Sequence, residues 1–107
     1  MSNMLPENKA AKVYRFLQKI PRGKVVTYGE LARASGLHPR TVGMLMRKNS
    51  DPVNIPCYKV VRSDGSLGGY SGAGGIGKKI ALLEKDGVEV KNGRIDLRKH
   101  THVILKS

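Results

Sequence analysis

The sequence predicts a mainly α-helical domain with small β-hairpins, built around a winged-helix-like helix-turn-helix. Apolar residues recur at helical spacing in several segments, and two short segments of this kind are separated by a glycine-containing turn. Turn-forming residues at 63–65 and 91–93 separate short runs of β-branched residues. The 107 residues suffice for one compact domain with a single hydrophobic core and are too few for two.

The first helix is expected over about residues 6–20. Four apolar residues occupy the i, i+3, i+4 and i+7 positions of one helix face: Val13, Phe16, Leu17 and Ile20. The Pro-Arg-Gly sequence at 21–23 ends this helix because proline and glycine both disfavour its continuation. A short extended segment at 24–26 follows.

Two short helices then form the predicted helix-turn-helix. Thr27 and Glu30 match a capping box, which predicts a helix over 28–35, and Gly36 suits the left-handed residue that ends it. A proline at the first helical position favours a second helix over 39–48. This arrangement is typical of DNA-binding domains.

The remaining segments predict two hairpins and one further helix. A hairpin is expected over 60–68, and seven glycines within 65–77 predict a sharply bent loop or a close approach of the backbone to something else. Apolar spacing predicts a helix over 76–86, and an Asn-Gly turn predicts a second hairpin over 88–97. Residues 98–107 are expected to form a short strand or coil.

The charge balance favours a polyanionic partner. Twenty Lys and Arg face eight Asp and Glu, a net charge of +12, and residues 1–62 hold 12 basic but only 3 acidic side chains. Such a basic region favours nucleic acid, although a lysine-rich solvated surface would have the same composition. No apolar run is long enough to span a membrane, and the first residues lack the apolar core of a secretory signal. One cysteine excludes an internal disulfide and a cysteine-based zinc site.

That cysteine, Cys57, is the strongest candidate for chemistry. It follows a proline and precedes a short apolar strand, with Lys59 and Arg62 close in sequence. Cationic neighbours increase the thiolate fraction of a cysteine, and the thiolate is the nucleophile. The alternative is that Cys57 is a small buried hydrophobic residue, as most free cysteines are.

Four ordered segments of the chain resemble the DNA-binding and active-site domain of the O6-alkylguanine-DNA alkyltransferases. They are IPRGKVVTYGELA, RTVGMLM, IPCYKVVRSDGSLGGYSG and KKIALLEKDGV, and together they cover roughly residues 9–97. The resemblance implies DNA repair by irreversible transfer of an alkyl group from guanine O6 to the protein's own cysteine. It implies one alkyltransferase domain over 1–107, without the N-terminal domain that the family carries.

The resemblance also implies how the damaged base is held. Cys57 would accept the alkyl group, and the hydroxyl of Tyr28 would lie near guanine N3 after the nucleotide has been flipped out of the duplex. The carbonyl of Val60 would accept a hydrogen bond from the guanine amine. Tyr70 and the N–H of Ser71 would close the alkyl pocket over O6.

Further residues are implied to order the site or contact DNA. Asn49 would order the loop before the cysteine, and Asp86 lies where the family has a glutamate at the end of a proton relay. Four residues of the second helix are assigned to the DNA surface: Arg40, Thr41, Gly43 and Arg47. Arg40 would enter the duplex and fill the space left by the flipped nucleotide, with its helix in the minor groove.

The expected partner is double-stranded DNA containing O6-alkylguanine. The resemblance implies no metal, no cofactor and no membrane, and we expect a cytoplasmic monomer located wherever the genomic DNA lies. Three assignments keep an alternative: Tyr28 could pack against the first helix, Arg40 could make an ordinary phosphate contact, and Asp86 could cap a helix. The histidines at 38, 100 and 102 are expected on the surface.

Tyr58 departs from the family, which has histidine after the cysteine. A phenol, with a pKa of about 10 against about 6.5 for imidazole, is the poorer base at neutral pH. Either Tyr58 relays the thiol proton with a pKa lowered by Lys59, or water delivers that proton to Asp86. A sister group of alkyltransferase-like proteins has tryptophan in place of the cysteine and binds alkylated DNA without repairing it. That sensor function is the alternative, and a winged-helix transcription regulator is a third class.

Overall fold

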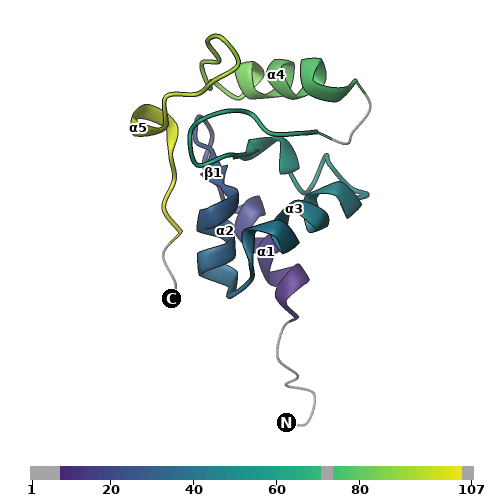
Figure 1. Ribbon diagram of the computed structural model, residues 1–107. Helices are drawn as coiled ribbons and strands as arrows, with labels where there is room; N and C mark the ends of the chain where they lie inside the picture. Colours follow the sequence, from purple (N-terminus) through teal and green to yellow (C-terminus); the bar gives the residue numbers. More distant parts are fainter. Residues whose placement is uncertain (1–7, 71–73, 105–107) are drawn as a thin grey trace, which may run out of the picture.

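The structure, a computed structural model, describes residues 8–70 and 74–104 (Figure 1). Its elements follow one another in this order: α1 (Lys9–Gln18), β1 (Val26–Thr27), α2 (Tyr28–Ser35), α3 (Pro39–Lys48), the 3-10 helix η1 (Cys57–Lys59), β2 (Val60–Val61), α4 (Gly75–Lys85) and α5 (Leu97–His100). The predicted fold class is confirmed, since helices dominate and α2 and α3 form the expected helix-turn-helix.

The helix ends follow from local sequence. The side chain of Asn8 accepts a hydrogen bond from Ala11 N at 2.8 Å, so α1 begins at Lys9 rather than near residue 6. The Thr27 hydroxyl accepts from Glu30 N at 3.0 Å and caps α2, which ends at Gly36 with a φ of 75°. Such a left-handed conformation costs glycine no steric penalty. The short helix α5 is not apparent in the apolar pattern of its four residues.

A central segment of β1 and β2 separates two apolar clusters. Val26 and Val60 pack with α1, α2 and α3, whereas Val25 and Val61 pack with Leu83 of α4. Successive residues of a strand point to opposite faces, so neighbouring valines enter different clusters. Figure 1 accordingly shows α4 on one side of this segment and the three N-terminal helices on the other.

The strands pair differently from the predicted hairpins. The tight turns form as expected: Arg62 N donates to Ser66 O at 2.9 Å, and Lys91 N donates to Arg94 O at 2.9 Å. However, β2 pairs in parallel with β1, with Val60 opposite Val26, and not with residues after its own turn. The two turns instead meet each other through an antiparallel bridge between Ser66 and Arg94.

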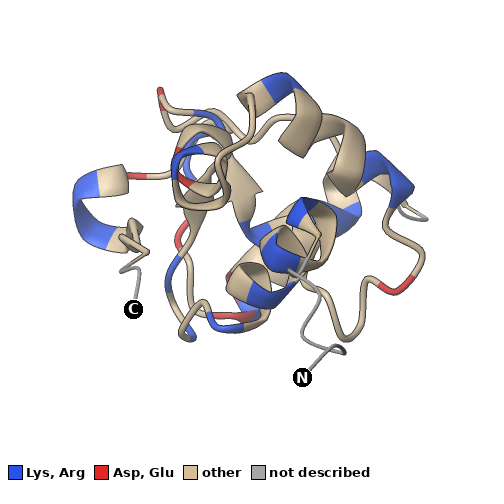
Figure 2. Ribbon diagram, turned by 90° about the horizontal axis from the view of Figure 1, so that it is seen from below, with Lys and Arg blue, Asp and Glu red and all other residues tan. Residues whose placement is uncertain are grey.

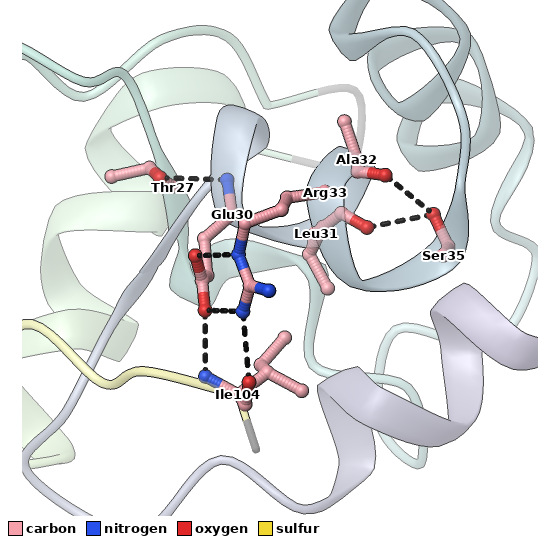
Figure 3. A network of polar contacts seen from close by, with 7 residues as sticks. All are labelled: Thr27, Glu30, Leu31, Ala32, Arg33, Ser35 and Ile104. Atoms are coloured by element: carbon pink, nitrogen blue, oxygen red, sulfur yellow. Dashed lines mark hydrogen bonds and ion pairs between the residues drawn. The ribbon is translucent and has the colours of Figure 1, made fainter. Parts of the chain in front are cut away.

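The segment after α5 returns to the start of the helix-turn-helix. Thr101 pairs in parallel with Val25, and the carboxylate of Glu30 accepts hydrogen bonds from Arg33 and from the backbone N–H of Ile104 (Figure 3). His100 was expected on the surface, and this is wrong. The residue is 5% exposed, its Nδ1 lies 2.8 Å from Gly23 O, and its Nε2 accepts from Glu89 N at 3.4 Å, so two earlier segments of the chain pack against it.

Candidate functional site

Cys57 is held by an ordered loop between α3 and η1. The side-chain amide of Asn49, the residue after α3, donates to Ile55 O at 2.8 Å, and Cys57 N donates to the same carbonyl at 2.7 Å. The oxygen of the Asn49 amide accepts from Asp51 N at 2.9 Å. The Cys57 side chain is 8% exposed and packs in the core beside α1, α2 and α3. The position of Cys57 is compatible with both a small buried hydrophobic residue and a nucleophile, because Cys57 is buried and also borders a cleft.

This cleft, which we call the Cys57 cleft, has a volume of about 660 Å³. It brings together residues that the sequence assigned to the site from four separate segments: Tyr28, Arg40, Gly43, Arg47, Cys57 and Tyr70. Sequence reasoning missed others that line it: Pro39, Met46, Arg62, Gly68 and Gly69. The glycine-rich stretch was a usable signal for the last two, since it indicated a close backbone approach.

That close approach is between Gly68 and Tyr28. A Cβ at Gly68 would lie 3.2 Å from the Tyr28 hydroxyl oxygen and 3.3 Å from its ring, and Gly68 has a φ of 71°. Glycine is favoured here by its positive φ, and any larger residue would also press against the Tyr28 ring. Burial raises the pKa of Tyr28 further above 10; Arg62 opposes this rise and the Cys57 thiolate adds to it. The phenol is therefore neutral at physiological pH and can donate a hydrogen bond into the cleft.

Tyr58 and Asp86 border a different cleft, which we call the Tyr58 cleft. Its volume is about 490 Å³, and Tyr70 lines both clefts. Burial raises the pKa of Tyr58 to about 12, and the charge of Asp86 and its hydrogen bond with the phenol add to this rise. The expectation that Lys59 lowers the pKa of Tyr58 is wrong. The Lys59 amino group lies 2.9 Å from the Asp86 carboxylate, so its charge is largely neutralised there.

The Lys59–Asp86 ion pair joins segments that are far apart in sequence. The Lys59 side chain is buried, at 5% exposure, and that of Asp86 is partly buried, at 13%. Lys59 also donates to the carbonyls of Pro21 and Ile20, at 2.9 and 3.3 Å, and Asp86 accepts from Gly23 N at 3.1 Å. Asp86 is the C-cap residue of α4, as the alternative expected, and its carboxylate is paired rather than free.

The Val60 carbonyl already has one donor inside the protein. The amino group of Lys79 lies 2.7 Å from Val60 O and also donates to Leu67 O and Gly69 O. Sequence reasoning did not select Lys79. The signal was its position, because it lies three residues after Ile76 and four before Leu83, on the apolar stripe of α4 where a lysine is unexpected.

Basic and small residues of α3 face outward next to the Cys57 cleft. Arg40 and Arg47 are exposed, and no atom lies within 4 Å of a Cβ placed on Gly43, so this helix face is open to a partner. Thr41 is half-buried on α3 and does not line the cleft. Figure 2 shows basic residues spread over the helices with acidic ones few and separated. Ser71 lies outside the described residues.

No metal or membrane element accompanies the site in the part of the chain that the structure describes. Over residues 8–70 and 74–104, no three His, Cys, Asp or Glu residues lie close enough together to hold a metal ion. Within the same ranges no helix has the length and apolarity needed to cross a bilayer.

Comparison with known families gives a match over most of the chain. The model of the family described as "6-O-methylguanine DNA methyltransferase, DNA binding domain" matches residues 8–88. A protein of Picrophilus torridus named bifunctional methyltransferase/endonuclease is 52% identical over 90 residues, which cover 82% of this chain and 30% of that protein. The chain thus spans less than a third of the length of this curated relative.

Two solved structures resemble this fold over most of the chain. The structure of S. pombe Atl1 in complex with damaged DNA containing O6-carboxymethylguanine has a TM-score of 0.80 at 29% identity, covering 92% of this chain and 98% of that one. The O6-methylguanine-DNA methyltransferase of Pyrococcus kodakaraensis has a TM-score of 0.68 at 44% identity, covering 77% of this chain and 47% of that one.

Proposed function

The chain belongs to the family of O6-methylguanine DNA methyltransferases through their DNA-binding domain, and we propose that it repairs O6-alkylguanine in double-stranded DNA by transferring the alkyl group to Cys57. One observation carries this proposal: the only cysteine of the chain borders a cleft that is also lined by Tyr28, Arg40 and Tyr70. That cleft is open to solvent beside a basic helix, where a base extruded from a duplex could enter.

The reaction is a displacement at the alkyl carbon. The Cys57 thiolate attacks this carbon, a sulfur–carbon bond forms, and the bond from carbon to guanine O6 breaks. The guanine then takes up one proton to become the normal base, and the thiol has lost one. Nothing in this sequence of steps regenerates the thiol, so each protein molecule reacts once.

Tyr28 stabilises the leaving base in this proposal. Its raised pKa keeps the phenol protonated, so it donates a hydrogen bond to the guanine ring as negative charge develops there. Val60 is fully buried and does not line the cleft, so its carbonyl, which accepts from Lys79, is not open to the guanine amine in this structure. Tyr70 covers the alkyl group from the opposite wall, and Ser71 N–H is proposed to assist at O6.

In this proposal, residues of α3 contact the duplex and fill the space that the flipped nucleotide leaves. Flipping a nucleotide out of the stack costs a few kcal/mol, and we assign to Arg40 the role of filling the space that it leaves. Arg47 and Thr41 contact the backbone phosphates, and Gly43 permits close approach of the helix to the minor groove. Asn49 keeps the loop before Cys57 in place through its bond to Ile55.

Tyr58 is not the base that removes the thiol proton. A phenol with a pKa of about 12 holds its own proton at neutral pH and, hydrogen-bonded to Asp86, is a donor rather than an acceptor. This counts against the relay through Tyr58, and because Asp86 is already paired with Lys59, we propose in place of both expected routes that the thiol proton passes to water. Asp86 then acts through the position of Tyr58 and not as a free proton acceptor.

A damage sensor is the second candidate function. Its support is the likeness to S. pombe Atl1 along almost the whole of both chains, together with the loss of the family histidine at Tyr58. Such a protein would bind alkylated DNA in the same cleft and leave the alkyl group in place.

Counting restored guanine separates the two functions. A duplex with one O6-methylguanine is incubated with increasing amounts of protein, and the bases are then quantified after digestion. A transferase restores one guanine for each protein molecule and then stops, whereas a sensor binds the damaged duplex selectively and restores none. Cys57→Ala is expected to abolish restoration while keeping the binding. Equal binding to damaged and undamaged DNA without restoration would refute both functions.

A further inference from the structure

Lys79 is fully buried in α4 and its amino group lies among backbone carbonyls. Its exposure is 0%, and the group donates to Val60 O at 2.7 Å, to Leu67 O, and to Gly69 O at 3.1 Å. Buried lysines are rare because the charged form loses its hydration. An apolar residue at this position would avoid the loss of hydration, so the contacts of the Lys79 amino group are the feature to explain.

The contacts define the protonation state of this group. An ammonium has three N–H donors and no lone pair, whereas a neutral amine has two donors and one lone pair. Only the ammonium can donate to Val60, Leu67 and Gly69 at the same time. Burial lowers the pKa of Lys79 from 10.5 to about 8, which leaves it mostly charged at neutral pH.

The carbonyls that Lys79 joins belong to two segments that contribute to the Cys57 cleft: Gly69 lines the cleft, whereas Val60 and Leu67 are buried next to residues that line it. Val60 directly follows η1, which begins at Cys57, and Leu67 and Gly69 flank the Gly68 that packs against Tyr28. The side chain therefore ties the segment that carries the cysteine to the loop that positions the Tyr28 ring.

Lys79 also senses the charge of Cys57. A thiolate at Cys57 favours the charged form of Lys79, and Arg62 opposes it. The other titratable groups that sense Cys57 are Tyr14, Tyr28 and Tyr70, all of them neutral phenols at physiological pH with pKa values raised by burial. Lys59, the neighbour in sequence, is instead paired with Asp86.

We propose that Lys79 is a positioning residue for Cys57: its ammonium holds the Val60 carbonyl and the loop at Leu67–Gly69 around the cleft and supplies the fixed positive charge that favours the thiolate. This inference rests on the proposed role of Cys57 as a nucleophile. In this proposal the Lys79 ammonium takes over part of the role of the histidine that Tyr58 replaces. A fixed cation favours the thiolate, so the thiol proton is lost to water and is not accepted by a side chain.

The test measures the thiol without DNA. The rate at which iodoacetamide alkylates Cys57 is followed against pH for the wild type and for Lys79→Met, which keeps most of the side-chain length and removes the charge with its three hydrogen bonds. We expect the pH midpoint of the Cys57 alkylation rate to rise by about one pH unit in Lys79→Met. The alkylation rate at neutral pH should then be about tenfold lower. The matched control is Lys78→Met, the exposed neighbour on α4, whose charge is screened by solvent and salt. An unchanged midpoint in a folded Lys79→Met protein would overturn the inference.

A second measurement needs no variant and covers the case in which Lys79→Met does not fold. The lysine ammonium signals of the wild type are titrated by NMR before and after Cys57 is capped with a neutral carbamidomethyl group. One lysine is expected to titrate far below the others, and capping should lower its midpoint further because the thiolate is gone. No lysine of this kind, or no change on capping, would refute the coupling.

The two proposals fail in distinguishable ways. If the thiol midpoint depends on Lys79 but no alkyl group leaves the damaged duplex, the transferase function is wrong and the role of Lys79 stands. If alkyl transfer proceeds but the thiol midpoint is unchanged in Lys79→Met, the role of Lys79 is wrong and the transferase function stands.

Discussion

At the scale of single residues, Tyr58 shows how a neighbour decides what a side chain can do. Sequence alone left two routes open, one of which needed a lowered phenol pKa. The structure raises this pKa to about 12, through burial and through Asp86. That direction could not be predicted, because Asp86 lies 28 positions later in the chain and Lys59, the nearest cation in sequence, is bound to it.

We therefore expect Tyr58→Phe to change the transfer rate by no more than about twofold at neutral pH, because general-base contributions of about a hundredfold or more require a group that can accept the proton. Tyr58→His is the comparison variant and should raise the neutral-pH rate, since imidazole titrates near 6.5. Single-turnover rates on a damaged duplex measure both. A hundredfold loss in Tyr58→Phe would assign the hydroxyl to the relay after all.

Removing one charge of the Lys59–Asp86 pair is expected to destabilise the protein more than replacing both charged residues by apolar ones. Asp86→Ala leaves the Lys59 ammonium buried beside the Pro21 carbonyl without its counter-charge, which should lower the free energy of unfolding by about 3 kcal/mol. The double variant Lys59→Met/Asp86→Leu should recover a large part of this loss. Urea denaturation of Lys59→Met, Asp86→Leu and the double variant measures the coupling. Additive losses would show that the two charges do not depend on each other.

At the scale of elements, α2 is fixed at both ends and along one side. The Thr27 cap and the left-handed Gly36 were predictable because their signals are local. The contact of Glu30 with Ile104 was not, since 74 positions separate the two residues. Figure 3 shows this carboxylate between Arg33 and the returning chain. Because Tyr28 is the first residue of α2, these contacts also position the phenol in the Cys57 cleft.

The contribution of Glu30 should depend on pH. Its hydrogen bond with Arg33, assisted by the N–H of Ile104, lowers the pKa of this carboxyl below its ordinary 4.5, although partial burial opposes the shift. A carboxyl with a lowered folded-state pKa adds stability above its unfolded pKa and loses it as pH falls through the folded value. Glu30→Gln should therefore destabilise by about 1–2 kcal/mol at neutral pH.

That difference should shrink as the pH falls below 4.5. Urea denaturation across pH gives the measurement, with Glu84→Gln on the exposed face of α4 as the control that changes little. A Glu30→Gln difference that stays constant down to acid pH would contradict this account of the network.

At the scale of the whole molecule, the helices were predictable and their connections were not. Apolar spacing and caps are local signals, so α1, α2, α3 and α4 lie close to their expected ranges. The parallel pairing of Val26 with Val60 and the burial of His100 depend on segments that meet only after folding. The cleft residues Arg62 and Gly68 and the buried Lys79 were not assigned to the site although they lie within the family-like motifs, because only the fold shows that their segments meet at Cys57 and Tyr28.

The overall charge predicts how the protein binds DNA. With a net charge of +12, and with Arg40 and Arg47 exposed on α3, binding should release counterions from the phosphates. Each neutralised phosphate contributes about −0.9 to the slope of log affinity against log salt on duplex DNA. Affinity for duplexes of unrelated sequence, measured over a salt series, should fall steeply and similarly for all of them. A flat dependence would contradict the assignment of this surface to DNA.

The mass of the protein after reaction tests the transfer to Cys57 most directly. The wild-type chain is incubated with a duplex whose O6-methylguanine carries a deuterated methyl group, at several pH values from about 6 to about 9. Intact-mass analysis followed by peptide mapping then locates any label. We predict one deuterated methyl group per molecule, on the peptide that contains Cys57, and none in Cys57→Ala. Selective binding to the damaged duplex with no labelled protein at any of these pH values would contradict the transferase function and leave the protein a sensor of alkylated DNA.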